Sequence, residues 1–169
     1  RGTTRRHTER VLTSVGATAL LVTHDRDEAM SFADRLIVMR AGRAEQAGTP
    51  EELYAAPRSA FVAEFLGAAN FVEGEATGQS ARTALGEVPL RVPASGTVSL
   101  CLRPESLELV VEGGAPARVV EREYHGASCI YGVEGEGFQV AVLAVGDAPF
   151  RKGDAVGVRV RAPAVVLEG

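Results

Sequence analysis

The chain has 169 residues, of which 24% are charged, and its formal net charge is −4 with histidine neutral. This mild acidity excludes the clustered basic face of a nucleic-acid-binding protein, and no apolar run approaches the ~20 residues that span a bilayer. We therefore expect a soluble, cytoplasmic protein that binds no nucleic acid and inserts into no membrane. Cys101 and Cys129 each lie in an apolar, strand-like run, so we expect buried free thiols rather than a disulfide.

The first part of the chain shows a helix pattern followed by a strand pattern. Apolar residues at helical spacing within residues 1–17 predict a helix, which Gly16 ends. Residues 19–22 form a short apolar run and predict a buried strand. His7 lies in the basic N-terminal stretch, where we expect it at the surface.

A second histidine follows this predicted strand at once. His24 is the middle residue of Thr23-His24-Asp25 and lies where the strand pattern stops and a helix pattern starts. Open α/β sheets bind their ligands at this edge, so His24 is the candidate catalytic residue. The structural alternative is that His24 only caps the next helix. Asp25 is itself a predicted N-cap, with Glu28 three residues on, and this explains Asp25 without a catalytic role.

A hairpin and a helix are predicted next. Residues 36–39 form a continuous apolar run, which is typical of a strand covered on both faces. Ala41-Gly42 predicts a turn, and residues 43–47 predict the return strand. A capping box and an N-terminal proline then mark a helix start, in the order Thr49, Pro50 and Glu52, and Pro57 ends this helix.

The hydrophobic period changes near residue 70. Ser59 begins a further short helix that Gly67 ends, and alternating apolar residues dominate after about Asn70. We therefore predict two domains, residues 1–69 and residues 70–169. The second domain is predicted to be a small antiparallel β-barrel or curled sheet because of its alternating runs, which are Val98, Leu100 and Leu102; Phe138, Val140 and Val142; and Val156, Val158 and Val160.

The sequence lacks the motifs that hold the phosphates of a nucleotide. A phosphate loop needs G-x-x-x-x-G-K-[ST], so that glycine N–H groups and a lysine surround the phosphates. Lys152 is the single lysine and Arg151 precedes it, so no Gly-Lys pair exists. No apolar run ends in Asp-Glu, and no Ser-Gly-Gly helix start occurs. We therefore do not expect this chain to hydrolyse ATP alone.

Two longer stretches carry a family resemblance. The string VTHDRDEAMSFADRLIVMRAGRAEQAGTPEELYAAPRSAFVAEFLGAANF, within residues 18–72, resembles the end of the ATPase subunit of ATP-binding cassette (ABC) importers. LRPESLEL and GDAVGVRV resemble the small regulatory β domain of these subunits, called TOBE. EREYHG and AEFLGAANFVEGE resemble the ferric-iron and polyamine types, and ferric iron is our preferred cargo.

This resemblance implies a fold and a set of roles. The fold is α+β and mostly β: a truncated C-terminal piece of an α/β ABC ATPase domain, followed by a small antiparallel OB-like (TOBE) β-barrel. His24 corresponds to the switch histidine that hydrogen-bonds the γ-phosphate of ATP. ATP and Mg²⁺ would bind only the complete protein, and we expect neither cofactor nor metal site in this chain alone.

The implied partners are the membrane permease subunits of an importer and a second copy of the chain, at the inner face of the cell membrane. The Arg103-Pro104-Glu105 element has two interpretations, an Arg–Glu pair that holds a turn or a regulatory contact across the dimer. His125 is either a solvated turn residue or part of a small-anion pocket. The alternative function for the whole chain is a non-catalytic dimerisation or small-anion-sensing β module.

Overall fold

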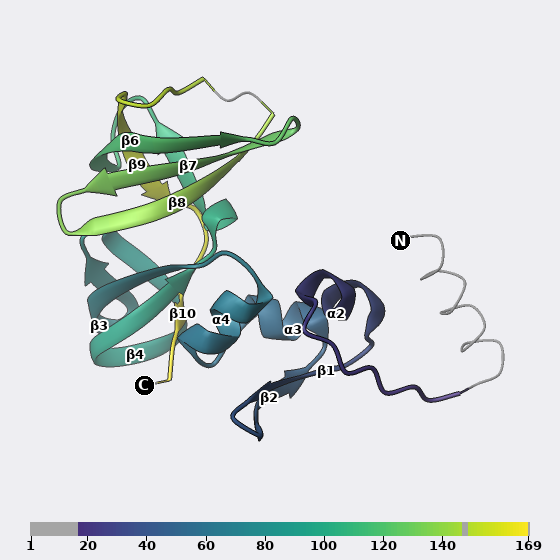
Figure 1. Cartoon of the computed structure of the whole chain (residues 1–169). Coiled ribbons are helices and arrows are strands. Elements are labelled where there is room, and N and C mark those ends of the chain that lie inside the picture. Colours follow the sequence, from purple (N-terminus) through teal and green to yellow (C-terminus); the bar gives the residue numbers. More distant parts are fainter. Residues whose placement is uncertain (1–16, 147–148, 169) are drawn as a thin grey trace. The chain divides into compact units, whose positions relative to one another are not determined.

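The computed structural model describes residues 17–146 and 149–168, which fall into two compact units, Arg1–Leu53 and Tyr54–Gly169 (Figure 1). The helix predicted within residues 1–17 and the surface position predicted for His7 lie outside the described residues, apart from residue 17. The division into domains at residues 69 and 70 stays a prediction.

The first unit contains a helix and an antiparallel hairpin. Helix α2 spans Arg26–Phe32, and strand β1 (Leu36–Arg40) pairs with strand β2 (Arg43–Gly48). Ala41 and Gly42 join the strands with φ angles of 48° and 78°. Two successive residues with positive φ make the tight turn that matches the twist of paired strands. The predicted turn and return strand are confirmed.

Two expectations for this unit are wrong. Residues 19–22 form no strand, and Leu20 and Val22 are each 89% exposed. A strand exists only where a neighbour pairs with its backbone, and no described residue pairs with this stretch. Strand β1 is also not covered on both faces, because Ile37 and Met39 are 61% and 60% exposed.

The connecting helices begin as their capping residues predict. Helix α3 spans Pro50–Ala55, and its capping box is formed in both directions. The backbone N–H of Thr49 donates to Glu52 Oε2 at 2.9 Å, and the N–H of Glu52 donates to Thr49 Oγ1 at 3.2 Å. Helix α4 spans Ala60–Leu66, with Ser59 as its N-cap and Gly67 as its C-cap.

The second unit is built mainly from two antiparallel sheets (Figure 1). The three-stranded sheet has the order β10-β4-β3, and the five-stranded sheet has the order β5-β9-β6-β7-β8. A short 3-10 helix, η1 (Pro104–Ser106), connects β4 to β5. The strands are β3 (Asn70–Thr83), β4 (Gly86–Leu102), β5 (Leu107–Val110), β6 (Ala115–Tyr124), β7 (Ser128–Gly135), β8 (Phe138–Val145), β9 (Ala155–Val160) and β10 (Val165–Val166).

The five-stranded sheet curls into a nearly closed barrel. Its two edge strands, β5 and β8, contact each other, and one apolar core joins it to the three-stranded sheet. Leu100, Tyr131 and Val158 are fully buried in this core. Cys101 and Cys129 are both buried and free, as predicted. The mostly β, OB-like barrel is therefore confirmed.

A side-chain amide fastens the β3–β4 hairpin to this barrel. Asn70, at the start of β3, is buried, and its Nδ2 donates to the carbonyl oxygen of Ala141 at 2.8 Å. The N–H of Ala141 donates back to Asn70 Oδ1 at 2.7 Å. The amide therefore supplies to β8 the donor and acceptor that a neighbouring strand would supply.

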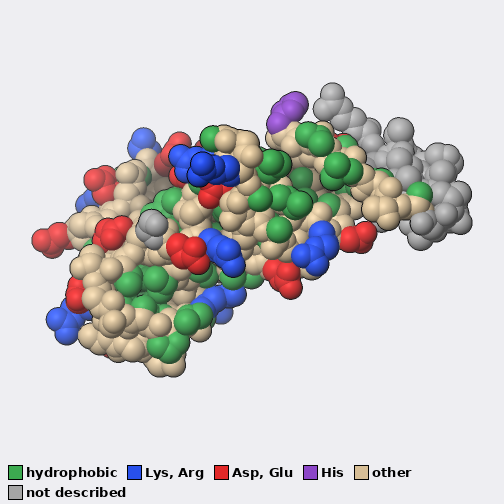
Figure 2. Space-filling model, turned by 90° about the horizontal axis from the view of Figure 1, so that it is seen from below, with side chains coloured by type: hydrophobic (Ala, Val, Ile, Leu, Met, Phe, Trp, Pro, Cys, Tyr) green, Lys and Arg blue, Asp and Glu red, His purple; other side chains and the backbone are tan. Residues whose placement is uncertain are grey.

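Within residues 17–146 and 149–168, no helix combines the length and the apolar character needed to cross a membrane. Acidic and basic side chains are interspersed on the face drawn in Figure 2, with apolar side chains between them.

Candidate functional site

His24 is exposed, and local hydrogen bonds fix the backbone on either side of it. The N–H of Asp25 donates to Thr23 Oγ1 at 3.0 Å, and the N–H of Glu28 donates to the Asp25 carboxylate, also at 3.0 Å. Asp25 is thus the N-cap of α2, as predicted, and the helix needs no cap from His24. The imidazole is left at the surface on a locally ordered backbone.

Arg103 joins several segments of the second unit through its side chain. It is only 8% exposed, and its guanidinium donates to four backbone carbonyls. The acceptors are Ala63, Gly67 and Ala68, at 2.9, 3.2 and 3.0 Å from Nη1, and Tyr54, at 3.1 Å from Nη2. The carbonyls at the end of a helix have no partner within it, and Arg103 donates to one of them, Ala63, and to the two carbonyls that follow the helix, Gly67 and Ala68. Its guanidinium also lies 4.0 Å from the centre of the Tyr54 ring.

Glu105 is bound to the same tyrosine. The hydroxyl of Tyr54 donates to Glu105 Oε1 at 2.7 Å, and Glu105 is exposed. No ion pair joins Arg103 to Glu105 in the described part of the chain, so the predicted Arg–Glu pair is wrong. The buried guanidinium of Arg103 is surrounded by backbone carbonyls, and it donates its hydrogen bonds to these acceptors. The contact across a dimer stays a prediction for both residues.

This environment raises the pKa of two acidic groups that are already neutral at pH 7. Burial, and then the hydrogen bond to Glu105, raises the pKa of Tyr54 to about 12, against an opposing effect of Arg103. Burial also raises the pKa of the Cys101 thiol. Both groups stay uncharged at neutral pH.

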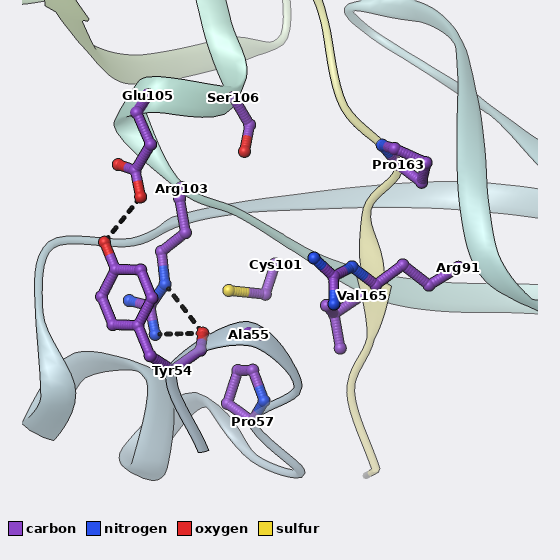
Figure 3. Close-up of a pocket in the computed structure, with 10 residues that line it drawn as sticks. All are labelled: Tyr54, Ala55, Pro57, Arg91, Cys101, Arg103, Glu105, Ser106, Pro163 and Val165. Atoms are coloured by element: carbon purple, nitrogen blue, oxygen red, sulfur yellow. Dashed lines mark hydrogen bonds between the residues drawn. The ribbon is translucent and has the colours of Figure 1, made fainter. Parts of the chain in front are cut away.

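These residues line a cleft of about 230 Å³ (Figure 3). Its polar lining comes from Tyr54, Arg91, Cys101, Arg103, Glu105 and Ser106, and its apolar lining includes two prolines and Val165. The sequence alone identified only Arg103 and Glu105 as candidates. The sequence did not identify Tyr54 and Arg91 as site residues, because no local pattern indicates that they lie beside residues 101–106 and 163–165.

His125 is an exposed turn residue. Its Nε2 lies 3.4 Å from Glu123 Oε2, and both side chains are more than half exposed. The exposure of both side chains favours the solvated turn over the small-anion pocket at this residue.

The sequence of the chain is similar to those of known proteins. Residues 100–167 match the model of the TOBE domain. The chain is 40% identical to the Fe(3+) ions import ATP-binding protein FbpC 1 of Rhodococcus jostii, over 98% of this chain and 50% of that protein. It is 42% identical to FbpC of Agrobacterium fabrum, over 72% of this chain and 37% of that protein. It is also 40% identical to the sulfate/thiosulfate import ATP-binding protein CysA 2 of Chromobacterium violaceum, over 76% of this chain and 37% of that protein.

The chain corresponds to a C-terminal piece of an ATP-binding protein of an ABC importer. It spans about half the length of the curated relatives it matches, and it corresponds to their C-terminal half. The resemblance found in the sequence is confirmed, and so is the TOBE domain.

Replacement of Arg103 tests its structural role. Arg103→Met leaves four carbonyls without their charged donor, so we expect the free energy of unfolding to fall by at least ~2 kcal/mol. Urea denaturation of the whole chain measures the change. The matched control is Arg82→Met on β3, where the arginine is exposed and the expected change is within about 0.5 kcal/mol. Equal stability of the two variants would contradict this role.

The raised pKa of Tyr54 predicts a pH dependence. Because the folded protein holds the neutral phenol, its stabilising effect is complete below about pH 10 and is lost as the pH rises through about 12. The ultraviolet difference titration between the wild type and Tyr54→Phe should be centred near pH 12, with circular dichroism recorded in parallel. Glu105→Gln should lower this midpoint. A midpoint near 10 in the folded wild type would rule out the hydrogen bond from Tyr54 to Glu105.

Proposed function

We propose that this chain supplies the switch-histidine segment and the regulatory domain of the ATP-hydrolysing subunit of an ABC importer. The observation that carries the proposal is the match over 98% of the chain to a relative named as an ATP-binding import protein. The exposed position of His24 and the TOBE domain at residues 100–167 support it.

His24 is proposed to hydrogen-bond the γ-phosphate of ATP in the complete protein. Phosphoryl transfer depends on positioning and charge stabilisation, so one well-placed donor has a large effect. The exposed imidazole, on a backbone held by Thr23 and Asp25, suits this role. The chain itself does not fit a nucleotide, because it has no Gly-Lys pair for the phosphates. We therefore assign ATP and Mg²⁺ to the complete protein only.

Ferric iron is the proposed cargo of the complete importer. The relative named for Fe(3+) import from Rhodococcus jostii aligns with 98% of the chain, whereas the sulfate/thiosulfate relative aligns with 76%. The identities are equal at 40%, so the preference rests on the longer match.

The proposed partners are the permease subunits of the importer and a second copy of this protein, at the cytoplasmic face of the cell membrane. Residues 70–169 are assigned to regulation and dimerisation. Glu105 is exposed and so can reach a partner, while the buried Arg103 would act by positioning α4. The alternative is a non-catalytic dimerisation or small-anion-sensing module. The contact of His125 with Glu123 gives no specific support for this alternative.

A histidine replacement in the complete protein tests this assignment. We expect His24→Ala to lower ATP turnover by roughly 10²-fold or more, as for the loss of one preorganised donor, while ATP binding persists. Steady-state hydrolysis and nucleotide binding are measured together. His125→Ala, which removes an exposed turn histidine, is the control and should keep normal turnover. Near-normal turnover in His24→Ala would reject the switch role.

A further inference from the structure

Among the charged residues that line the cleft in the second unit, Arg91 has no hydrogen-bond or ion-pair partner for its side chain within the described part of the chain. Arg103 donates to four carbonyls, and Glu105 accepts from Tyr54. Arg91 is exposed at the same cleft, and no side-chain hydrogen bond or ion pair of Arg91 is found in the part of the chain that the structure describes. Its guanidinium lies on the opposite side of the cleft from Glu105 (Figure 3). Arg91 therefore provides a positive charge that has no counter-ion among the described residues.

The backbone beneath Arg91 is fixed. Its N–H donates to the carbonyl oxygen of Ala164 at 3.0 Å, and the N–H of Ala164 donates to the carbonyl oxygen of Pro89 at 2.8 Å. These bonds hold the segment before β10 against β4. A side chain that starts from a fixed backbone loses less conformational entropy when it binds a ligand.

The remaining lining is neutral. Cys101 is buried and its pKa is raised, so the thiol adds no negative charge beside the guanidinium. Ser106 is held through its backbone, which donates to Arg103 O and accepts from the N–H of Arg161, at 2.8 Å each. Its hydroxyl has no hydrogen bond to any other described residue, and it remains available as a donor.

The size and the apolar lining limit the ligand. The volume of about 230 Å³ lies below the range of roughly 300–1,000 Å³ for drug-sized pockets, so a small ligand is favoured. Pro57, Pro163 and Val165 give apolar contact. Glu105 repels a multiply charged anion in the same cleft more strongly than a singly charged one, because the repulsion grows with the charge.

We propose that this cleft binds a small organic monocarboxylate, with the carboxylate on Arg91 and the carbon chain against the proline and valine side chains. A guanidinium matches a carboxylate with two parallel hydrogen bonds, and this makes the single arginine a sufficient anchor. The binding is independent of ATP and of any permease, so it can fail without affecting the proposed transport function.

Nuclear magnetic resonance titration of the whole chain tests the site. The probes are propionate, lactate and pyruvate, with sulfate and phosphate compared at equal ionic strength. We expect saturable shifts at the amides of Cys101 and Ser106 with a Kd on the order of 1 mM for at least one carboxylate. Arg91→Gln should weaken this binding at least ~10-fold, the loss of one charge-assisted anchor. Arg82→Gln, an exposed arginine on β3 with the same change of charge, should leave it unchanged.

Three results would overturn the proposal. The first is the absence of saturable shifts with every carboxylate. The second is equal binding by the wild type and Arg91→Gln while the spectrum of the variant stays that of a folded protein. The third is tighter binding of sulfate or phosphate than of any carboxylate, which would assign the cleft to inorganic anions.

Discussion

The structure of the second unit depends on how the carbonyls at the end of α4 are satisfied. A short helix leaves its last carbonyls without partners, and burying them unpaired costs free energy. Arg103 brings one guanidinium to the carbonyl of Ala63 in α4, to those of Gly67 and Ala68 just after the helix, and to that of Tyr54. A guanidinium can do this because its five N–H groups point in several directions from one rigid plane. The end of α4 and the end of β4 are thereby held together.

The hairpin and the barrel are joined in the same way. Asn70 pairs both amide atoms with the backbone of Ala141, so β8 gains a partner from a side chain instead of a strand. Both junctions use side chains from distant parts of the sequence to complete backbone hydrogen bonding. The cleft that contains Arg91 and Cys101 lies beside the Arg103 junction, which explains why it is lined by residues from several elements.

The sequence predicted what local chemistry decides. The capping box of Thr49 and Glu52 and the turn at Ala41-Gly42 need only neighbouring residues, and both are confirmed. Alternating apolar residues likewise predicted the barrel, because a strand buries every second side chain. The expected strand at residues 19–22 failed because pairing depends on a neighbour that the described residues do not supply.

The candidate site was predicted only in part. His24 was identified by its place between two patterns, and the structure shows an exposed ring there. The hydrogen bond between Tyr54 and Glu105 joins residues 51 positions apart, and no local pattern encodes such a distance. The same holds for Arg103, whose acceptors lie 35 to 49 residues away. Which carbonyls surround a buried arginine is decided by the packing of the whole unit.

Native-state hydrogen exchange tests most directly whether Arg103 joins α4 to the β unit. If it does, the amide of Ala63 in α4 should exchange through the same opening as the core of β4 at Leu100, with opening free energies within about 1 kcal/mol. A fast, low-energy opening of α4, while β4 stays protected, would contradict a shared unit held by this guanidinium.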